Sequence, residues 1–148
     1  SDVDTFQRLK YSKPDEWSDL KGLYSYKGRV PEATKADFQT YKKIKATGIY
    51  GTVRVPAAKI DTSALTLDVA HINERRHGVT QEEAVSYIKN AAFSLKRRHW
   101  TGETFLNYYS EEGASYVRTS DNVIRTSFKK DEFDKKTKSA MEVLKNGK

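Results

Sequence analysis

The sequence predicts an α+β fold in which N-terminal helices pack on a four-stranded antiparallel sheet, with an N-terminal arm. Two observations predict this class. Apolar residues recur at helical spacing before residue 92, and four short runs of alternating apolar and polar residues follow it. Helical and strand patterns that are segregated along a chain are typical of α+β domains. We expect residues 1–48 to form the arm and its helix, and residues 49–148 to form the main domain.

In the first part of the chain, proline and glycine residues separate segments with helical and strand patterns. Scattered aromatic residues predict the arm over residues 1–30, with one short helix near residues 15–21. Pro31 begins a helix that extends to about Ala46, because proline suits a first helical turn. Ile49–Val55 alternates apolar with polar residues and is therefore predicted to be a strand.

The rest of the chain begins with two further helices and continues with the sheet. The apolar residues from Leu65 to Ile72 lead into a helix that carries His71. Thr80 and Glu83 have the spacing of a capping box, so another helix begins there and ends near residue 90. We expect four strands joined by turns, and then a closing helix: Phe93–Trp100, Thr104–Ser110, Ala114–Thr119, Val123–Phe128 and Asp131–Leu144.

The composition favours an anionic partner. The 148 residues include 27 Lys and Arg against 20 Asp and Glu, a net charge of +7. Such an excess suits nucleic acid, a membrane surface or an acidic protein. The chain has no cysteine, which excludes disulfides, cysteine-ligated zinc and a cysteine nucleophile. Its three histidines lack HExxH spacing, glycine-rich nucleotide motifs are absent, and no apolar run could span a membrane, so we expect no metal, no cofactor and no membrane.

The segment from Leu67 to His77, LDVAHINERRH, is the strongest candidate for a site. In a helix, His71 and Arg75 are four residues apart and share a face. A side chain that can move a proton near neutral pH would then lie beside a permanent cation. Such a pair suits a reaction at a phosphate, because one group transfers the proton and the other holds negative charge. A solvated helix face is the alternative interpretation of the same residues.

The predicted sheet repeats a combination of hydroxyl, aromatic and cationic residues. Guanidinium groups can hold phosphates and tyrosine rings can stack on splayed bases, so this combination suits single-stranded RNA. Strand propensity alone also accounts for tyrosine, threonine and arginine in a sheet. The RNA-binding candidates are Arg76, Lys96, Arg97, Arg98, Tyr108, Arg118, Arg125 and Ser127.

RNA can be cleaved by its own ribose 2′-OH, without a metal or a protein nucleophile. A base removes the 2′-OH proton, an acid protonates the leaving oxygen, and cations stabilise the phosphate. The catalytic candidates for these roles are His71, Arg75, Tyr109 and Thr126. His77 and His99 compete with His71 for proton transfer, and the residues alone do not choose among the three.

The order of these motifs resembles the barnase/EndoU/colicin/RelE-like (BECR) nuclease superfamily, in its phage-borne and polymorphic-toxin branch. The resemblance rests on HINERR in a helix, a TxEE helix start, an NYYSEEG hairpin and a late RTSF strand. It covers about residues 65–144, and the region before Ile49 has no counterpart. It implies a metal-independent endoribonuclease with an α+β fold. The functional positions that it implies are His71, Arg75 or Arg76, Tyr109 with Ser110, and Thr126.

Domains of that branch end prophage head proteins and secreted toxins. The resemblance therefore implies a toxin that is secreted or phage-delivered and acts in the bacterial cytoplasm. The chain starts at Ser1 and shows no signal peptide, which predicts a domain excised from a longer protein. We expect RNA as the substrate, with tRNA as a candidate target. We also expect an acidic immunity protein that blocks the basic groove in the producing cell.

Two other functions fit parts of the pattern. An ADP-ribosyltransferase toxin would need an Arg/Ser/Glu set, which Arg54, Ser127 and Glu111 or Glu112 could supply, although no Glu-x-Glu pair occurs. Incorporation of labelled NAD would identify this activity. A non-catalytic nucleic-acid-binding module of a phage head protein would hold phosphates through the same arginines. Salt-sensitive binding without turnover would identify that function.

Overall fold

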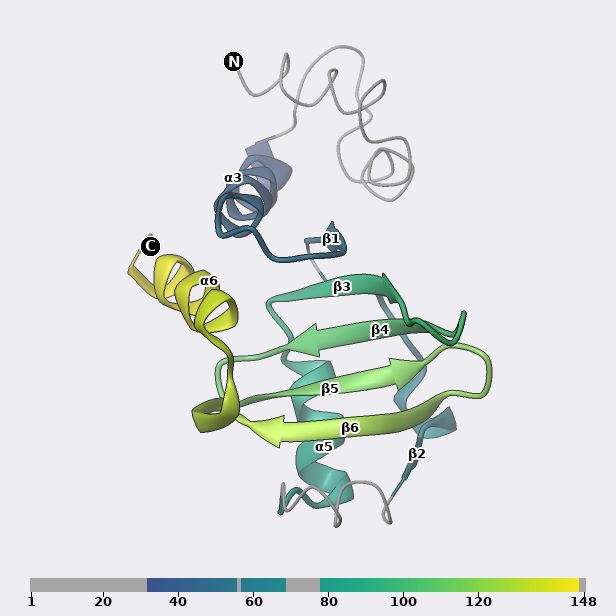
Figure 1. The fold of residues 1–148 in the computed structure, drawn as a ribbon. Coiled ribbons are helices and arrows are strands. Elements are labelled where there is room, and N and C mark those ends of the chain that lie inside the picture. Colours follow the sequence, from purple (N-terminus) through teal and green to yellow (C-terminus); the bar gives the residue numbers. More distant parts are fainter. Residues whose placement is uncertain (1–31, 56, 69–77, 147–148) are drawn as a thin grey trace.

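The computed structural model describes residues 32–55, 57–68 and 78–146. Within these ranges the chain forms three α-helices and one six-stranded mixed sheet, which confirms the α+β class (Figure 1). The helices are α3 (Glu32–Ala46), α5 (Gln81–Lys89) and α6 (Lys135–Asn146), with short 3-10 helices at Thr62–Ala64 and Lys130–Glu132. The strands are β1 (Thr52–Arg54), β2 (Thr66–Leu67), β3 (Phe93–Arg98), β4 (Thr104–Tyr109), β5 (Gly113–Arg118) and β6 (Val123–Lys129).

The sheet has the order β1-β3-β4-β5-β6-β2. Its centre is the predicted meander, in which β3, β4, β5 and β6 pair antiparallel with their neighbours along the chain. The prediction of a sheet of four antiparallel strands is not confirmed, because both edges carry a further strand. β1 pairs antiparallel with β3, and β2 pairs parallel with β6. With only two residues, β2 is too short to produce an alternating pattern that a sequence could reveal.

Helix α5 covers one side of the sheet, which we call the α5 face. The helix begins at the predicted capping box: Thr80 accepts a hydrogen bond from the Glu83 N–H, and the Glu83 carboxylate accepts one from the Thr80 N–H (both 3.1 Å). Its apolar side packs on alternate residues of the strands, because successive strand residues point to opposite faces. This core comprises Leu65, Val79, Ala84, Tyr87, Ile88, Tyr108, Val117 and Ile124.

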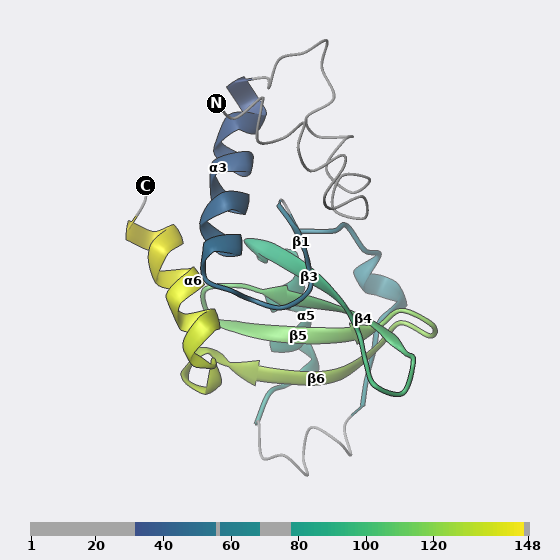
Figure 2. The same ribbon diagram turned by 45° about the horizontal axis from the view of Figure 1, so that its top comes forward.

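Helices α3 and α6 contact each other and cover the opposite side of the sheet, which we call the α6 face. Figures 1 and 2 show both helices gathered at one end of the sheet. The core beneath them contains a chain of aromatic contacts, in which Tyr109 stacks on Phe93 at 5.1 Å and meets Phe133 edge-on at 6.2 Å. The ends of β3 and β5 and the beginnings of β4 and β6 lie beyond these two helices, and no other described helix or strand covers the α6 face there; we call this its open part.

Two predicted features lie outside the described residues: the arm with its short helix near residues 15–21, and the helix that carries His71. The last helix begins four residues later than the sequence pattern predicts, at Lys135 rather than Asp131. Residues 130–132 form a 3-10 turn instead, and the Asp134 carboxylate then accepts a hydrogen bond from the Thr137 N–H (2.8 Å) at the start of α6. No helix among the described residues is long and apolar enough to cross a membrane.

Candidate functional site

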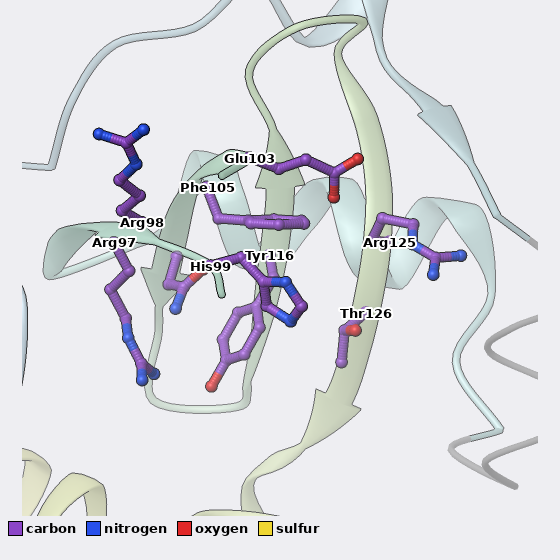
Figure 3. Close-up of a pocket in the computed structure, with 9 residues that line it drawn as sticks. Arg97, Arg98, His99, Glu103, Phe105, Tyr116, Arg125 and Thr126 are labelled. Carbon is purple, nitrogen blue, oxygen red and sulfur yellow. The ribbon is translucent and has the colours of Figure 1, made fainter. Parts of the chain in front are cut away.

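A cavity of about 320 Å³ occupies the open part of the α6 face; we call it the α6-face cavity. Its floor is a row of residues that face one another across three strands: Asn107 of β4, Tyr116 of β5 and Thr126 of β6. The side chains around this floor come from the β3–β4 hairpin and from β6 (Figure 3). The complete lining is Arg97, Arg98, His99, Glu103, Phe105, Asn107, Tyr116, Arg125 and Thr126.

A β-bulge places two consecutive residues of β6 at this cavity. The pairing of β5 with β6 shifts register between Tyr116, which pairs with Thr126, and Val117, which pairs with Ile124. Arg125 is the extra residue, and such a residue departs from the strict alternation of a strand. Arg125 and its neighbour Thr126 therefore both line the cavity, whereas Ile124 remains in the core beneath α5.

His99 lies where β3 ends and a tight turn begins. The turn is closed by a hydrogen bond from the Gly102 N–H to the His99 carbonyl (2.8 Å), and the His99 N–H donates to the Glu103 carbonyl (2.7 Å). The Thr101 hydroxyl lies 2.9 Å from Nδ1 of His99, and the Thr101 N–H donates to the same nitrogen at 3.4 Å. The exposed imidazole packs edge-on against Phe105 at 5.8 Å. Figure 3 shows the His99 ring and the Glu103 carboxylate both extending toward β6.

Two arginines of β3 supply cations at the rim of the cavity. Arg97 passes over Gly51, where a β-carbon would lie 2.9 Å from its Cγ, and its guanidinium lies 5.5 Å from the centre of the Tyr50 ring. Arg98 extends in the opposite direction from the strand (Figure 3). Both side chains are exposed, and neither forms an ion pair with another described residue.

The other two arginines of this region are held by carboxylates. Arg118 donates two hydrogen bonds to Asp121, at 2.9 and 2.7 Å, and lies 3.7 Å from the Glu103 carboxylate. These bonds hold the pKa of the Asp121 carboxyl below its ordinary value. Arg125 forms an ion pair with Asp68. Glu103 is thus oriented by Arg118, and Arg125 by Asp68, which fixes the charges on two sides of the cavity.

Two tyrosine hydroxyls connect the cavity with the core. The Tyr116 hydroxyl lies 2.9 Å from the Tyr109 hydroxyl, and Tyr109 is 3% exposed. Burial raises the pKa of both phenols, so both hydroxyls are neutral near neutral pH. They can donate hydrogen bonds but cannot act as bases there. Tyr109, a predicted catalytic residue, therefore reaches the cavity only through Tyr116.

Two features of the site are typical of a surface that holds a ligand. Asn107 is 2% exposed, and its Oδ1 has no hydrogen-bond partner among the described residues. A buried acceptor without a partner is costly unless a ligand supplies a donor. Trp100, 89% exposed, lies beside His99 with 5.3 Å between ring centres, and Tyr50 is 73% exposed. Apart from Val143, these are the exposed large apolar residues of the described chain.

The structure brings four of the predicted site residues to the cavity: Thr126, Arg97, Arg98 and Arg125. It places the other described candidates elsewhere. Arg118 binds Asp121 beside the cavity, and Lys96 lies on the α5 face. Tyr108 and Ser127 are fully buried, and the Ser127 hydroxyl contacts the Ser115 hydroxyl at 2.9 Å. The catalytic candidates His71 and Arg75, and Arg76 with them, lie outside the described residues.

Sequence reasoning did not place Glu103, Tyr116, Trp100 or Tyr50 in the site, and it gave His99 only as a competitor. The signal that could have found Trp100 and Glu103 is the turn WTGE, which directly follows a strand that carries Lys96, Arg97 and Arg98. A turn at the end of such strands places its side chains beside whatever the strands bind. No group of three or more metal-ligating side chains occurs among the described residues. Comparisons of the chain with known family models, with curated proteins and with solved structures find no match.

Proposed function

We propose that the protein is a metal-independent endoribonuclease that binds single-stranded RNA on the open part of the α6 face. The observation that carries this proposal is the cavity lined by Arg97, Arg98, His99 and Glu103, with exposed Trp100 beside it. Cations next to an exposed aromatic ring suit a phosphate chain with unstacked bases. A histidine and a carboxylate supply the two proton-transfer groups that cleavage by the 2′-OH requires.

The proposed reaction assigns one role to each group. The Glu103 carboxylate removes the proton from the ribose 2′-OH, whose oxygen attacks the adjacent phosphorus. Protonated His99 gives its proton to the departing 5′-oxygen as the bond from phosphorus to that oxygen breaks. Arg97 stabilises the negative charge on the reacting phosphate as these bonds form and break. The products are a 2′,3′-cyclic phosphate and a 5′-hydroxyl end.

The sequence-based assignment to His71 and Arg75 stays a prediction beside this one. The BECR-like fold also stays part of the proposal; the order of a helix followed by the β3–β6 meander supports it. If the protein is a delivered toxin, the basic α6-face cavity is the surface that an acidic immunity protein would cover. The immunity protein would then compete with RNA for this surface.

The direct test is incubation of the protein with RNA in EDTA, beside a 2′-O-methyl RNA of the same sequence. We expect fragments with 2′,3′-cyclic phosphate ends from the RNA and none from the methylated strand, which has no 2′-OH to attack. His99→Ala should reduce the cleavage rate by about 10²-fold or more. Lys138→Gln, an exposed position on α6, is the matched surface control. Cleavage that is undiminished in His99→Ala would contradict the assignment.

Two further variants separate the competing assignments. If Glu103 and His99 act together, Glu103→Gln and His99→Ala should each lose activity. His71→Ala should then remain active. Loss of activity in His71→Ala alone, with a folded protein, would instead favour the helix histidine. Salt-sensitive binding of RNA without any product, in the wild-type protein, would favour a non-catalytic nucleic-acid-binding module.

The geometry does not favour ADP-ribosyl transfer. Arg54, Ser94, Tyr108, Ser115 and Ser127 lie in one row across the sheet. Four strand spacings therefore separate Arg54 from Ser127, on the order of 19 Å. The Ser127 hydroxyl is also buried, so this arginine and serine cannot share one NAD site. Labelled NAD should leave the protein and its partners unmodified.

A further inference from the structure

A second cationic cavity, of about 480 Å³, lies on the other side of the same strands. We call it the α5-face cavity. It lies at the part of the α5 face formed by β1, β3 and the beginning of β4, beside the loop of residues 57–60. Its described lining is Thr52, Arg54, Ala58, Lys59, Ser94, Lys96, Thr104, Leu106 and Thr119.

The charges of the lining suit a negatively charged group. It contains three cations, Arg54, Lys59 and Lys96, and no acidic residue among the described residues that form it. None of the three forms an ion pair with another described residue. Four hydroxyl-bearing side chains, of Thr52, Ser94, Thr104 and Thr119, complete the wall. Cations with hydroxyls are the usual partners of phosphate oxygens.

The loop that supplies Lys59 is attached to the sheet. The Ala58 N–H donates a hydrogen bond to the Ser94 hydroxyl (2.9 Å), which joins residues 36 positions apart in the sequence. Arg54 lies close enough to the buried phenol of Tyr108 to lower its pKa, although burial raises that pKa more strongly. The fold therefore keeps the loop backbone that carries Lys59, and the half-buried Arg54, beside this cavity.

The two cavities meet at strand β3. Lys96 lines the α5-face cavity, and the next residue, Arg97, lines the α6-face cavity on the other side of the sheet. No described residue of the α5-face cavity is aromatic, so it can hold a phosphate but offers no ring for a base to stack on. Aromatic rings lie at the other cavity instead, with Trp100 and Tyr50. This division is expected if a single RNA strand places its bases at the α6-face cavity and only its backbone at the α5-face cavity.

We propose that the α5-face cavity is a second binding site for the phosphodiester backbone of the RNA, reached after the strand has passed around the β1–β3 edge of the sheet. This inference rests on the proposed function for its ligand, but it concerns binding and does not require cleavage. It implies that a long RNA binds more tightly than a short one, because only the long strand can contact both faces. It also implies that the cations of the α5-face cavity contribute nothing to the binding of a short RNA strand.

The test compares Arg54→Gln/Lys59→Gln with the wild-type protein, using 2′-O-methyl RNA of about 4 and about 16 nucleotides. Lys138→Gln/Lys145→Gln removes the same charge from exposed positions of α6 and is the matched control. For the long strand, we expect the first variant to reduce the salt slope of log Kd by about 1.4, which corresponds to two lost phosphate contacts at about 0.7 each. For the short strand, both variants should bind like the wild type.

A measurement on the unmodified protein avoids dependence on the variants' folding. Backbone amide resonances of Ala58 and Lys59, in the loop beside the α5-face cavity, should shift with the long RNA and not with the short one. Equal affinity of all three proteins for the long strand, or equal shifts with both lengths, would overturn the proposal. Shifts at these amides with inorganic phosphate but not with long RNA would also overturn the proposal, because the ligand of the cavity would then be a free anion. If the protein cleaves nothing but the length effect is present, the proposed function fails and this inference stands.

Discussion

Tyr108 is a residue whose burial leaves a polar atom without a partner. Its side chain is fully buried beneath α5, and its hydroxyl has no hydrogen-bond partner among the described residues. Removing such a hydroxyl removes a desolvation cost and leaves the ring packing intact. We therefore expect Tyr108→Phe to raise the free energy of unfolding by about 1 kcal/mol at neutral pH. Urea unfolding followed by circular dichroism measures this, and a loss of stability would show that the hydroxyl has a partner in solution.

The same residue predicts how stability depends on alkaline pH. Burial raises the pKa of Tyr108 from 10.0 to about 12. The unfolded chain therefore releases this proton first as the pH rises, and folding stability falls. The contribution of Tyr108 is fully present below about pH 10 and is lost progressively up to about pH 12. Tyr108→Phe should show a smaller fall in unfolding free energy over that range than the wild type, and an identical fall would contradict the raised pKa.

Asn107, the neighbour of Tyr108 on β4, also has an unpartnered atom but lies at the floor of the α6-face cavity. Asn107→Leu should therefore keep or raise stability by about 1 kcal/mol while it removes the group available to a ligand. We expect the Kd for 2′-O-methyl RNA to increase about tenfold. Tyr108→Phe is the matched control, because it removes an orphan polar atom from the other face and should leave RNA binding unchanged. Unchanged affinity in both variants would exclude Asn107 from the site.

At the scale of elements, α5 depends on a glycine of β5. A β-carbon at Gly113 would lie 2.4 Å from Cε2 of Tyr87, closer than real contacts allow. The same β-carbon would lie 2.6 Å from the Phe128 carbonyl oxygen of β6, so Gly113→Ala must displace both α5 and β6 and should cost roughly 1–3 kcal/mol of stability. Tyr87→Leu would remove the ring atoms that clash, so the double variant should be more stable than the sum of the two single changes predicts. Thermal or urea unfolding of all four proteins measures this coupling, and strict additivity would contradict it.

The sequence patterns predict an element well where the apolar pattern repeats several times within it. Helices α3 and α5 and the four central strands occur within about two residues of their predicted positions, because several turns or alternations define each. The alternation of a strand also accounts for Phe93, Leu95 and Arg97, which share one face of β3. It could not tell which end of that face α3 and α6 cover. The position of these two helices determines that Tyr109 is buried, whereas Tyr116 lines the cavity.

The candidate site was predicted in part for the same reason. Thr126 and the arginines of β3 and β6 followed from the strand pattern, but His99 and Trp100 lie at a turn, where side chains follow no period. The bulge that turns Arg125 toward the cavity is a one-residue irregularity, which no alternation rule predicts. The α5-face cavity joins a loop at Lys59 to β1 and β3, and only the folded chain places these segments together.

At the scale of the whole molecule, the two cavities give the protein cations on both sides of one sheet. Arg97 and Arg98 lie at one cavity, and three more cations lie at the other. Each phosphate contact to a single strand contributes about 0.7 to the salt slope of log Kd. Contact with both cavities therefore predicts a slope of about 3.5, and contact with the α6-face cavity alone predicts about 1.4.

These slopes separate the two modes of binding in one titration. A fourfold increase in salt should weaken the binding of a long 2′-O-methyl RNA about 100-fold if both faces are used, and about sevenfold if only one is. A short strand should show the smaller effect in either case. We expect the larger effect for the long strand, measured by fluorescence anisotropy at several salt concentrations. If the long strand shows the smaller effect, the RNA stays on the α6 face, and the positive charge beneath β3 acts only in the initial attraction of the strand.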